Sequence, residues 1–505
     1  ELAATGLRGV MERGGGEALG LLASPRSTME ELLLMRLLAD GLGTPHVDHR
    51  LGQQDFRNAW ANPPLSDMTS PIAVWSAMKA VVLAGTNLRQ EAPLLTLRLR
   101  KAVTAGGRVV ALAPRDAGYR FTLTQQSLGG DLVAELAGIA RAMKGKRRIP
   151  EHLSALLTAV KPTEAQGLCA ELLGQEHAGL LVGGVAQMSP QWCDIHALAN
   201  QIAAWSGARL LCLPQAGNSV GARLMGIMPE PGRGKSWTDM DAKGYMLLDV
   251  APEDTLDAPL MQERFRHADC VVALGSFRST ALATRPAAEH AIRILLPVAA
   301  ALEKEGTLVN MEGTWQATRG AGHPPGEARP AWKVLRVLGN QLGLAGFEWN
   351  TLGELTRTAR ERVASSPGHG DDSSGYILEE KGGDSPARVA RGGIAEGGLW
   401  HVPEPAACQM DALMRHASSL QATVHAKGDA MARIHPQSAR EHGIMASGEV
   451  EVRQGGRAVR IWLELDEGVA QGVVVSAWPG PMTAALGRSR ERIELMAMPQ
   501  EALVP

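Results

Sequence analysis

Apolar runs typical of buried strands alternate with amphipathic helical patterns along the first part of the chain. Residues 18–23 form a short apolar run, and after a Ser-Pro-Arg-Ser-Thr turn the apolar residues recur at helical spacing, as Leu32, Met35, Leu38 and Ala39. Ser27 is the predicted N-cap of this helix, and Glu30 completes a capping box. Gly41 and Gly43 then end the helix. The segment therefore predicts one strand, turn and helix unit of an α/β fold.

The same order of elements recurs further along the chain. Apolar runs predict strands at residues 80–84, 108–113, 179–183, 209–213, 245–250, 270–274 and 292–296, and helical patterns cover residues 93–105, 190–205 and 330–342. Repeated strand and helix alternation predicts parallel sheets. We therefore expect a doubly wound α/β domain over residues 70–289, and a discontinuous α/β domain made of residues 1–69 and 290–363.

The last third of the chain has a different pattern. Residues 364–400 are rich in Gly, Ser, Asp and Lys and have no sustained period, which predicts a linker. Residues 401–505 contain short β-rich runs at 450–453, 459–465 and 473–477, separated by turns that contain glycine. This segment is predicted to be a small C-terminal β domain.

Composition and charge exclude several classes of protein. Apolar residues make up 45% of the 505 residues, and 51 basic side chains nearly balance 53 acidic ones, so the net charge of −2 does not favour nucleic acid or an anionic membrane as a partner. The apolar stretch at residues 72–83 contains Lys79 and is too short to cross a bilayer. The chain opens with Glu1 and has no export signal, which we interpret as a fragment or a partly described protein.

The cysteines are scattered. They are Cys169, Cys193, Cys212, Cys270 and Cys408, and their spacing fits neither a disulfide framework nor a common metal-ligand run. Isolated thiols of this kind are typical of a reducing compartment, where cysteine behaves as a small buried apolar residue.

Two glycine turns are candidate phosphate-binding loops. Gly183-Gly184 and Gly85-Thr86-Asn87 each follow a predicted strand and precede a predicted helix, where backbone amides and the helix dipole can hold an anion. Neither has the three glycines and the downstream acidic residue of a dinucleotide fingerprint. Tight structural turns are therefore the favoured interpretation.

Two groups of residues have weak metal-site character. His46, Asp48 and His49 lie close together, and Cys193 with His196 forms a lone Cys-x-x-His pair. Zinc sites normally need four ligands, or three and a water molecule. We interpret both groups as polar residues at the ends of elements.

Charge clusters and catalytic motifs add no site. Glu303-Lys304-Glu305 is predicted to be a solvated face, and the basic run of Lys144, Lys146, Arg147 and Arg148 to be an exposed loop or a protein contact. No His-Glu-x-x-His or P-loop pattern occurs. The residues themselves thus predict no catalytic residue, no cofactor-binding residue and no metal ligand.

Several segments together resemble one family. They are residues 22–28, 47–50, 84–89, 217–222, 305–310 and 326–336, the last of which reads Gly-Glu-Ala-Arg-Pro-Ala-Trp-Lys-Val-Leu-Arg. In this order they resemble the large iron-sulfur subunit of bacterial NADH:quinone oxidoreductase, or respiratory complex I. The Gly-Thr-x-x-Asn and Ser-Pro-x-Ser-Thr stretches also resemble the wider molybdopterin oxidoreductase superfamily, and the segment from Arg433 to Val450 resembles its dinucleotide-binding barrel domain.

The resemblance implies both a fold and a role. The implied fold is the formate dehydrogenase and DMSO reductase type, with doubly wound parallel sheets and a small C-terminal β-barrel-like domain. The family's [2Fe-2S] and [4Fe-4S] clusters are held by cysteine runs in an N-terminal region, and those runs are absent here.

The implied role is a cofactor-free structural part of the peripheral arm, without molybdopterin. Its partners would be the NADH- and FMN-binding, small iron-sulfur and quinone-proximal subunits at the cytoplasmic face of the bacterial inner membrane. The alternatives are a fragment of an active molybdopterin-dependent enzyme, such as a formate dehydrogenase, and a stand-alone scaffold with no redox role.

Overall fold

The structure is a computed structural model, and it describes residues 1–279, 282, 286–288, 290–365, 398–488 and 492–498. The chain divides into two compact units. The first unit consists of Glu1–Gly52, Pro214–Ile377 and Asp411–Ala417, and the second of Gln53–Leu213, Leu378–Met410 and Ser418–Pro505. The predicted linker at residues 364–400 lies almost wholly outside the described residues.

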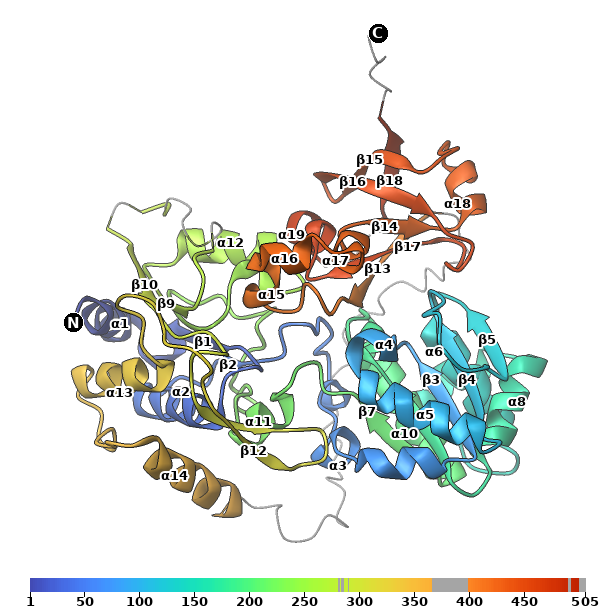
Figure 1. The fold of residues 1–505 in the computed structure, drawn as a ribbon, viewed down its shortest axis with the longest axis horizontal. Helices are drawn as coiled ribbons and strands as arrows, with labels where there is room; N and C mark the ends of the chain where they lie inside the picture. The colour runs from blue at the N-terminus through green and yellow to red at the C-terminus, as the bar shows by residue number, and fades with distance from the viewer. Residues whose placement is uncertain (280–281, 283–285, 289, 366–397, 489–491, 499–505) are drawn as a thin grey trace. The chain divides into compact units, whose positions relative to one another are not determined.

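A parallel sheet forms the centre of the first unit (Figure 1). Its strand order is β10-β9-β8-β1-β2, with β1 at Leu19–Ala23, β2 at Val47–Asp48, β8 at Gly244–Leu248, β9 at Cys270–Gly275 and β10 at Ile292–Pro297. This differs from the predicted boundaries, because β8 pairs with β1 and β9 pairs with β8, rather than with strands of residues 70–213. Every one of these apolar runs fits a buried strand, so periodicity does not decide which runs become neighbours.

Helices and a hairpin complete the first unit. The helices are α1 (Leu2–Gly14), α2 (Met29–Leu42), α11 (Ser219–Leu224), α12 (Ala258–His267), α13 (Ala331–Gln341), α14 (Leu352–Ser365) and α15 (Ala412–His416), and β11 (Gly306–Val309) pairs antiparallel with β12 (Trp315–Thr318). The N-cap of α2 is Thr28 with Glu31, one residue later than predicted. Ser27 Oγ is buried there without a hydrogen-bond partner among the described residues.

The second unit contains a second parallel sheet, of strand order β5-β4-β3-β6-β7 (Figure 1). The strands are β3 (Ala80–Ala84), β4 (Arg108–Ala113), β5 (Gln125–Leu128), β6 (Ala178–Val182) and β7 (Arg209–Cys212). The helices are α3 (Leu65–Met68), α4 (Leu88–Glu91), α5 (Pro93–Thr104), α6 (Leu132–Met143), α7 (Glu151–Thr158), α8 (Glu164–Leu173), α9 (Gly184–Gln187) and α10 (Trp192–Ser206). This is the doubly wound topology that the alternating pattern predicts.

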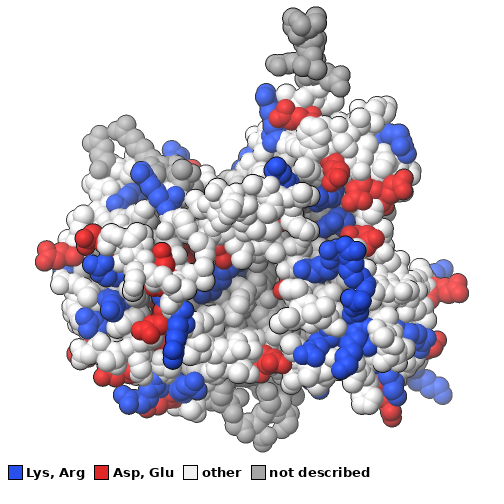
Figure 2. Space-filling model, viewed as in Figure 1, with Lys and Arg blue, Asp and Glu red and all other residues white. Residues whose placement is uncertain are grey.

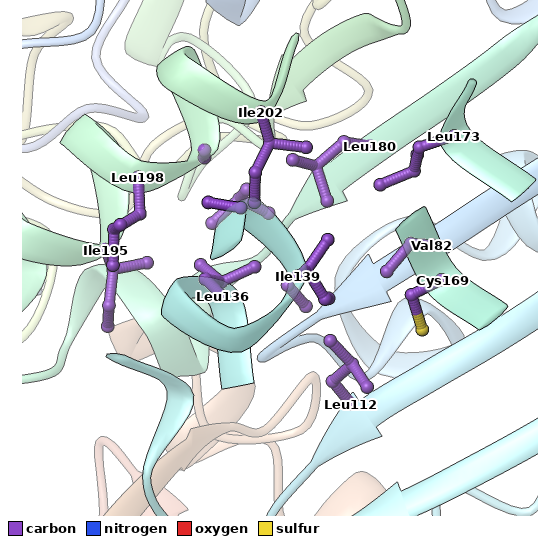
Figure 3. Close-up of a cluster of buried hydrophobic side chains, with 14 of the residues drawn as sticks. Val82, Leu112, Leu136, Ile139, Cys169, Leu173, Leu180, Ile195, Leu198 and Ile202 are labelled. Carbon is purple, nitrogen blue, oxygen red and sulfur yellow. The ribbon is translucent and has the colours of Figure 1, made fainter. Parts of the chain in front are cut away.

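The apolar core of this sheet explains why the strands are continuously hydrophobic. Figure 3 shows Leu136 and Ile139 of α6 lying against side chains of α8, α10 and the strands, among them Val82 and Leu180. The side chains drawn are buried and belong to one contiguous cluster. Parallel strands covered by helices have no solvated face, so a period of two is lost.

A mixed sheet forms the C-terminal part of the second unit. Its order is β13-β17-β14-β16-β15-β18, with β13 at Trp400–Pro405, β14 at Ala432–Ile434, β15 at Gly448–Gln454, β16 at Arg457–Leu465, β17 at Val473–Trp478 and β18 at Glu494–Ala497. Short helices α16 (Ser418–Gln421), α17 (Val424–Asp429), α18 (Pro436–Glu441) and α19 (Pro481–Leu486) accompany it. Among all the residues described, no helix is both long and apolar enough to span a bilayer.

Candidate functional site: the switch point of the second unit

The two predicted glycine turns meet at one edge of the second unit's sheet. Strands β3 and β6 are parallel neighbours, with Ala84 in register with Val182, so the turns that follow them lie side by side. The chain runs from β3 to β4 and β5 on one side and returns to β6 and β7 on the other. In doubly wound folds, ligands bind outside the carboxyl ends of the strands at this switch point.

The side chain of Glu91, at the end of α4, occupies the space between the two turns. Its Oε2 accepts a hydrogen bond from the Gly184 amide at 2.5 Å, and its Oε1 accepts from the Asn87 amide at 2.6 Å and from Thr86 Oγ1 at 2.9 Å. The carboxylate thus satisfies amides at the starts of two short helices, which are the groups that would otherwise bind an external anion.

The electrostatic state of Glu91 reflects two opposing effects. Burial raises the pKa of its carboxyl group to about 7, while the hydrogen bonds from Gly184, Asn87 and Thr86 act in the opposite direction. A nearby carboxylate, Glu404, raises the pKa further. The effect of burial thus outweighs that of the hydrogen bonds on the pKa of Glu91.

The glycines of the turns are needed for packing inside the chain. A Cβ atom on Gly183 would overlap Thr86 Cβ, and one on Gly85 would lie 2.5 Å from Leu132 Cδ1. A Cβ on Gly184 would lie 2.5 Å from Pro405 Cγ. The two turns lie so close to one another and to strand β13 that other parts of the chain occupy the positions where a Cβ atom would stand.

A second carboxylate, Glu404 of β13, covers the same edge. Its oxygens accept hydrogen bonds from Arg115 Nε at 2.9 Å and Arg115 Nη2 at 3.0 Å, and the side-chain amide of Asn87 donates to it as well. Arg115 follows β4, so strand β13 brings together the ends of two neighbouring strands of the parallel sheet. The pair is a two-bond guanidinium and carboxylate contact, the strongest common geometry for such ions.

Local sequence reasoning missed these three charged residues. Glu91 lies four residues after Asn87, a spacing that could have indicated a carboxylate folding back on the turn. Glu404 and Arg115 are separated by 289 residues, so no local pattern could have paired them.

The structure places His46, Asp48 and His49 in separate polar contacts in the first unit. Asp48 is fully buried and pairs with Arg50 at 2.8 Å, whereas His46 Nε2 lies 3.1 Å from Glu17 Oε2. His49 Nδ1 lies 2.6 Å from the Ile227 carbonyl oxygen, and burial lowers the pKa of its imidazole to about 4. Each side chain is engaged by the surrounding protein.

Cys193 and His196 lie on α10 and are buried. His196 stacks on Trp192 with ring centroids 5.1 Å apart, and its Nδ1 lies 2.8 Å from the Trp60 carbonyl oxygen. Burial raises the pKa of the Cys193 thiol to about 12. Within the described part of the chain, no group of three or more His, Cys, Asp and Glu side chains is placed to hold a metal ion.

The two charge runs have different outcomes. Lys146, Arg147 and Arg148 are exposed, as predicted, whereas Lys144 of the same run is half-buried. The prediction of a solvated face at residues 303–305 is wrong for Lys304, which is 6% exposed and whose Nζ donates to Glu31 at 2.8 Å. Glu31 is wholly buried, and a lysine can be buried when a carboxylate neutralises it.

Residues 1–341 match the family model for "Molybdopterin oxidoreductase". The chain is 28% identical over 341 residues to "NADH-quinone oxidoreductase subunit 3" of Thermus thermophilus, covering 65% of this chain and 40% of that protein. It is 27% identical over 278 residues to the mitochondrial "NADH-ubiquinone oxidoreductase 78 kDa subunit" of Candida albicans, covering 52% of this chain and 31% of that protein. It is 23% identical over 337 residues to the "NADH-ubiquinone oxidoreductase 75 kDa subunit" of Reclinomonas americana, covering 62% of this chain and 42% of that protein. The chain thus spans about two fifths or less of these relatives.

A solved structure shares the fold over nearly the whole chain. "Acetylene Hydratase from Pelobacter acetylenicus" superposes with a TM-score of 0.69 over 96% of this chain and 83% of that one. The sequence identity is 14%, so the likeness concerns the fold alone. It extends past residue 341, where the family match ends, into the C-terminal mixed sheet.

Proposed function

The chain belongs to the molybdopterin oxidoreductase family, and from this premise we propose that it is a cofactor-free structural part of the large subunit of an NADH:quinone oxidoreductase. Its relatives are subunits of NADH-quinone and NADH-ubiquinone oxidoreductases. In this role the chain supports electron transfer through iron-sulfur clusters held elsewhere in the enzyme. Its partners are the other peripheral-arm subunits, at the cytoplasmic face of the bacterial inner membrane.

The closed switch point is the observation that carries the cofactor-free part of the proposal. A pterin dinucleotide contains phosphates, which doubly wound folds hold on backbone amides at the carboxyl ends of their strands. Here the backbone amides of Gly85 and Gly183 donate to carbonyl oxygens of the chain. The backbone amides of Asn87 and Gly184 donate to the Glu91 carboxylate. A phosphate at this edge would meet the Glu91 carboxylate, so the residues present do not fit the group.

The thiols support the same proposal. Cys169, Cys193, Cys212 and Cys270 are buried, and burial raises the pKa of each thiol above its ordinary value. Iron-sulfur clusters need thiolates that converge on one site, and the described residues contain no group of three or more His, Cys, Asp and Glu side chains placed to hold a metal ion.

Metal analysis of the purified chain tests the proposal. We expect a chain isolated under anaerobic conditions to contain neither iron nor molybdenum in stoichiometric amount, and the enzyme from the host to retain this chain together with its NADH-oxidising subunits. Stoichiometric molybdenum would instead support a molybdopterin-dependent oxidoreductase. Failure to co-purify with the NADH-oxidising subunits would exclude the structural role.

A further inference from the structure

Helix α5 of the second unit presents an outer face that the described protein does not cover. Its inner face buries Leu95, Leu99 and Ala102. On the outer face, Leu94 is 65% exposed and Leu97 is 59% exposed. Arg98 and Lys101 continue the same face, because positions i, i+3, i+4 and i+7 of a helix lie together.

Several basic residues lie near the two leucines. Arg89 of α4 and Arg100 of α5 add to Arg98 and Lys101, and Figure 2 shows Lys and Arg side chains gathered over α4 and α5. Glu91 is the only acidic residue from Leu88 to Ala105, and its carboxylate is turned inward to the glycine turns. We call Arg89, Leu94, Leu97, Arg98, Arg100 and Lys101 the α5 surface.

The basic groups of the α5 surface have no acidic partner among the described residues. Arg89 Nη1 donates to the carbonyl oxygens of Ala117 and Gly118. Exposed arginines elsewhere in the chain form ion pairs, such as Arg266 with Glu263 and Arg233 with Glu17. The whole chain has a net charge of −2, so the positive charge of this cluster is local and does not reflect the overall composition. Exposed leucines rimmed by charge of one sign favour a partner that has an apolar centre and the opposite charge.

We propose that the α5 surface docks onto an acidic surface of another subunit of the peripheral arm, with Leu94 and Leu97 buried at the centre and the basic residues forming the rim. The inference rests on the proposed function, which supplies the partner. An interface of this kind combines an apolar centre with a charged rim that steers and orients the partner. A membrane surface fits less well, since an interfacial helix needs a broad apolar face and the remaining apolar residues of α5 face the core.

Zero-length cross-linking in the native complex tests the contact directly. A carbodiimide joins a lysine ammonium to a carboxylate that touches it, and mass spectrometry then identifies both residues. We expect Lys101 to be joined to an aspartate or glutamate of a different subunit. Cross-links from Lys101 only to this subunit itself or to a second copy of it would overturn the inference.

Charge reversal provides the matched functional test. Arg98→Glu with Lys101→Glu should weaken retention of the partner subunit roughly tenfold, because two attractive contacts become repulsive. Lys427→Glu with Arg440→Glu changes the net charge equally at exposed positions of the same unit and should retain the partner as the wild type does. Equal loss of the partner subunit in both variants, or no loss in either, contradicts docking through the α5 surface.

Binding to anionic phosphatidylglycerol vesicles tests the lipid alternative. If the wild-type chain binds the vesicles and Arg98→Glu with Lys101→Glu abolishes this binding, the α5 surface is assigned to lipid instead.

The controls separate this inference from the proposed function. If the wild-type chain does not co-purify with the NADH-oxidising subunits, the proposed function fails. If it does co-purify, and Arg98→Glu with Lys101→Glu has no effect, only the docking inference fails. Leu94→Ser with Leu97→Ser should weaken retention at high salt as well, where the charged contacts are screened.

Discussion

His49 illustrates how burial changes the chemistry of a single side chain. It is 4% exposed, and burial lowers the pKa of its imidazole to about 4 although Asp48 favours the charged form. In the unfolded chain the imidazole titrates near its ordinary value of 6.5. As the pH falls, the unfolded state therefore binds the proton first. The stabilising contribution is complete above pH 6.5 and is lost as the pH falls toward 4.

Replacement of His49 by asparagine removes this titration and keeps a donor for the Ile227 carbonyl oxygen. Between pH 7 and pH 4 the wild type should lose about 2–3 kcal/mol more unfolding free energy than the variant. Urea unfolding at a series of pH values measures the difference. His323→Asn, at an exposed position, is the control and should follow the wild type; parallel curves for all three proteins would refute the assignment.

Lys304 and Glu31 form a buried ion pair that contributes to the first unit only as a complete pair. Lys304→Met leaves the Glu31 carboxylate buried without its cation and should destabilise the protein by about 3–5 kcal/mol. The double variant Glu31→Gln with Lys304→Met removes both charges and should recover most of this loss. Chemical denaturation of the two variants measures both effects. A double variant as unstable as the single one would show that packing, and not charge, sets the cost.

Among the helices and strands, close approach between segments decides which glycines are required. Gly183 joins β6 to α9, and a Cβ there would overlap Thr86 of the neighbouring turn. Gly167, in the interior of α8, has no atom within 4 Å of its ideal Cβ position. The sequence alone does not distinguish these two glycines, but close packing requires a glycine at position 183 and not at position 167.

Alanine substitution at the two positions should shift stability in opposite directions. Gly183→Ala should lower the unfolding free energy by about 1–3 kcal/mol, because neither turn can yield without moving its strand. Gly167→Ala should raise it by about 0.5–1 kcal/mol, because it lowers the entropy of the unfolded chain and favours the helix. Thermal unfolding measures both, and a destabilised Gly167→Ala would contradict the open space at that position.

In the tertiary structure as a whole, Glu404 and Arg115 connect the C-terminal mixed sheet to the parallel sheet within the second unit. The contact is partly buried and has two hydrogen bonds. A double-mutant cycle with Arg115→Met and Glu404→Gln should give a coupling energy of about 1–3 kcal/mol. Denaturant unfolding of the wild type and the three variants measures this energy, and additive effects would exclude a direct interaction.

Local sequence patterns predicted part of the elements, although helices such as α6 and α8 were not among those predicted, and the resemblance of several segments indicated the family. Strands such as β4 and helices such as α5 begin and end within a residue or two of their predicted bounds, because apolar spacing and end signals act over a few residues. The cap of α2 was displaced by one residue because Ser27 and Thr28 are both good caps and each has a glutamate three positions later.

Which elements share a sheet and which charges meet was decided by the folded chain alone. Strand β8 pairs with β1, and β9 pairs with β8. Lys304 contacts Glu31 across 273 residues, and Glu404 contacts Arg115 across 289. A local pattern encodes backbone preference and burial, whereas these pairings depend on loop closure and on the competition of many similar apolar runs for the same neighbours. The inward turn of Glu91 belongs to the same class, since the Gly184 amide that it binds lies 93 residues away.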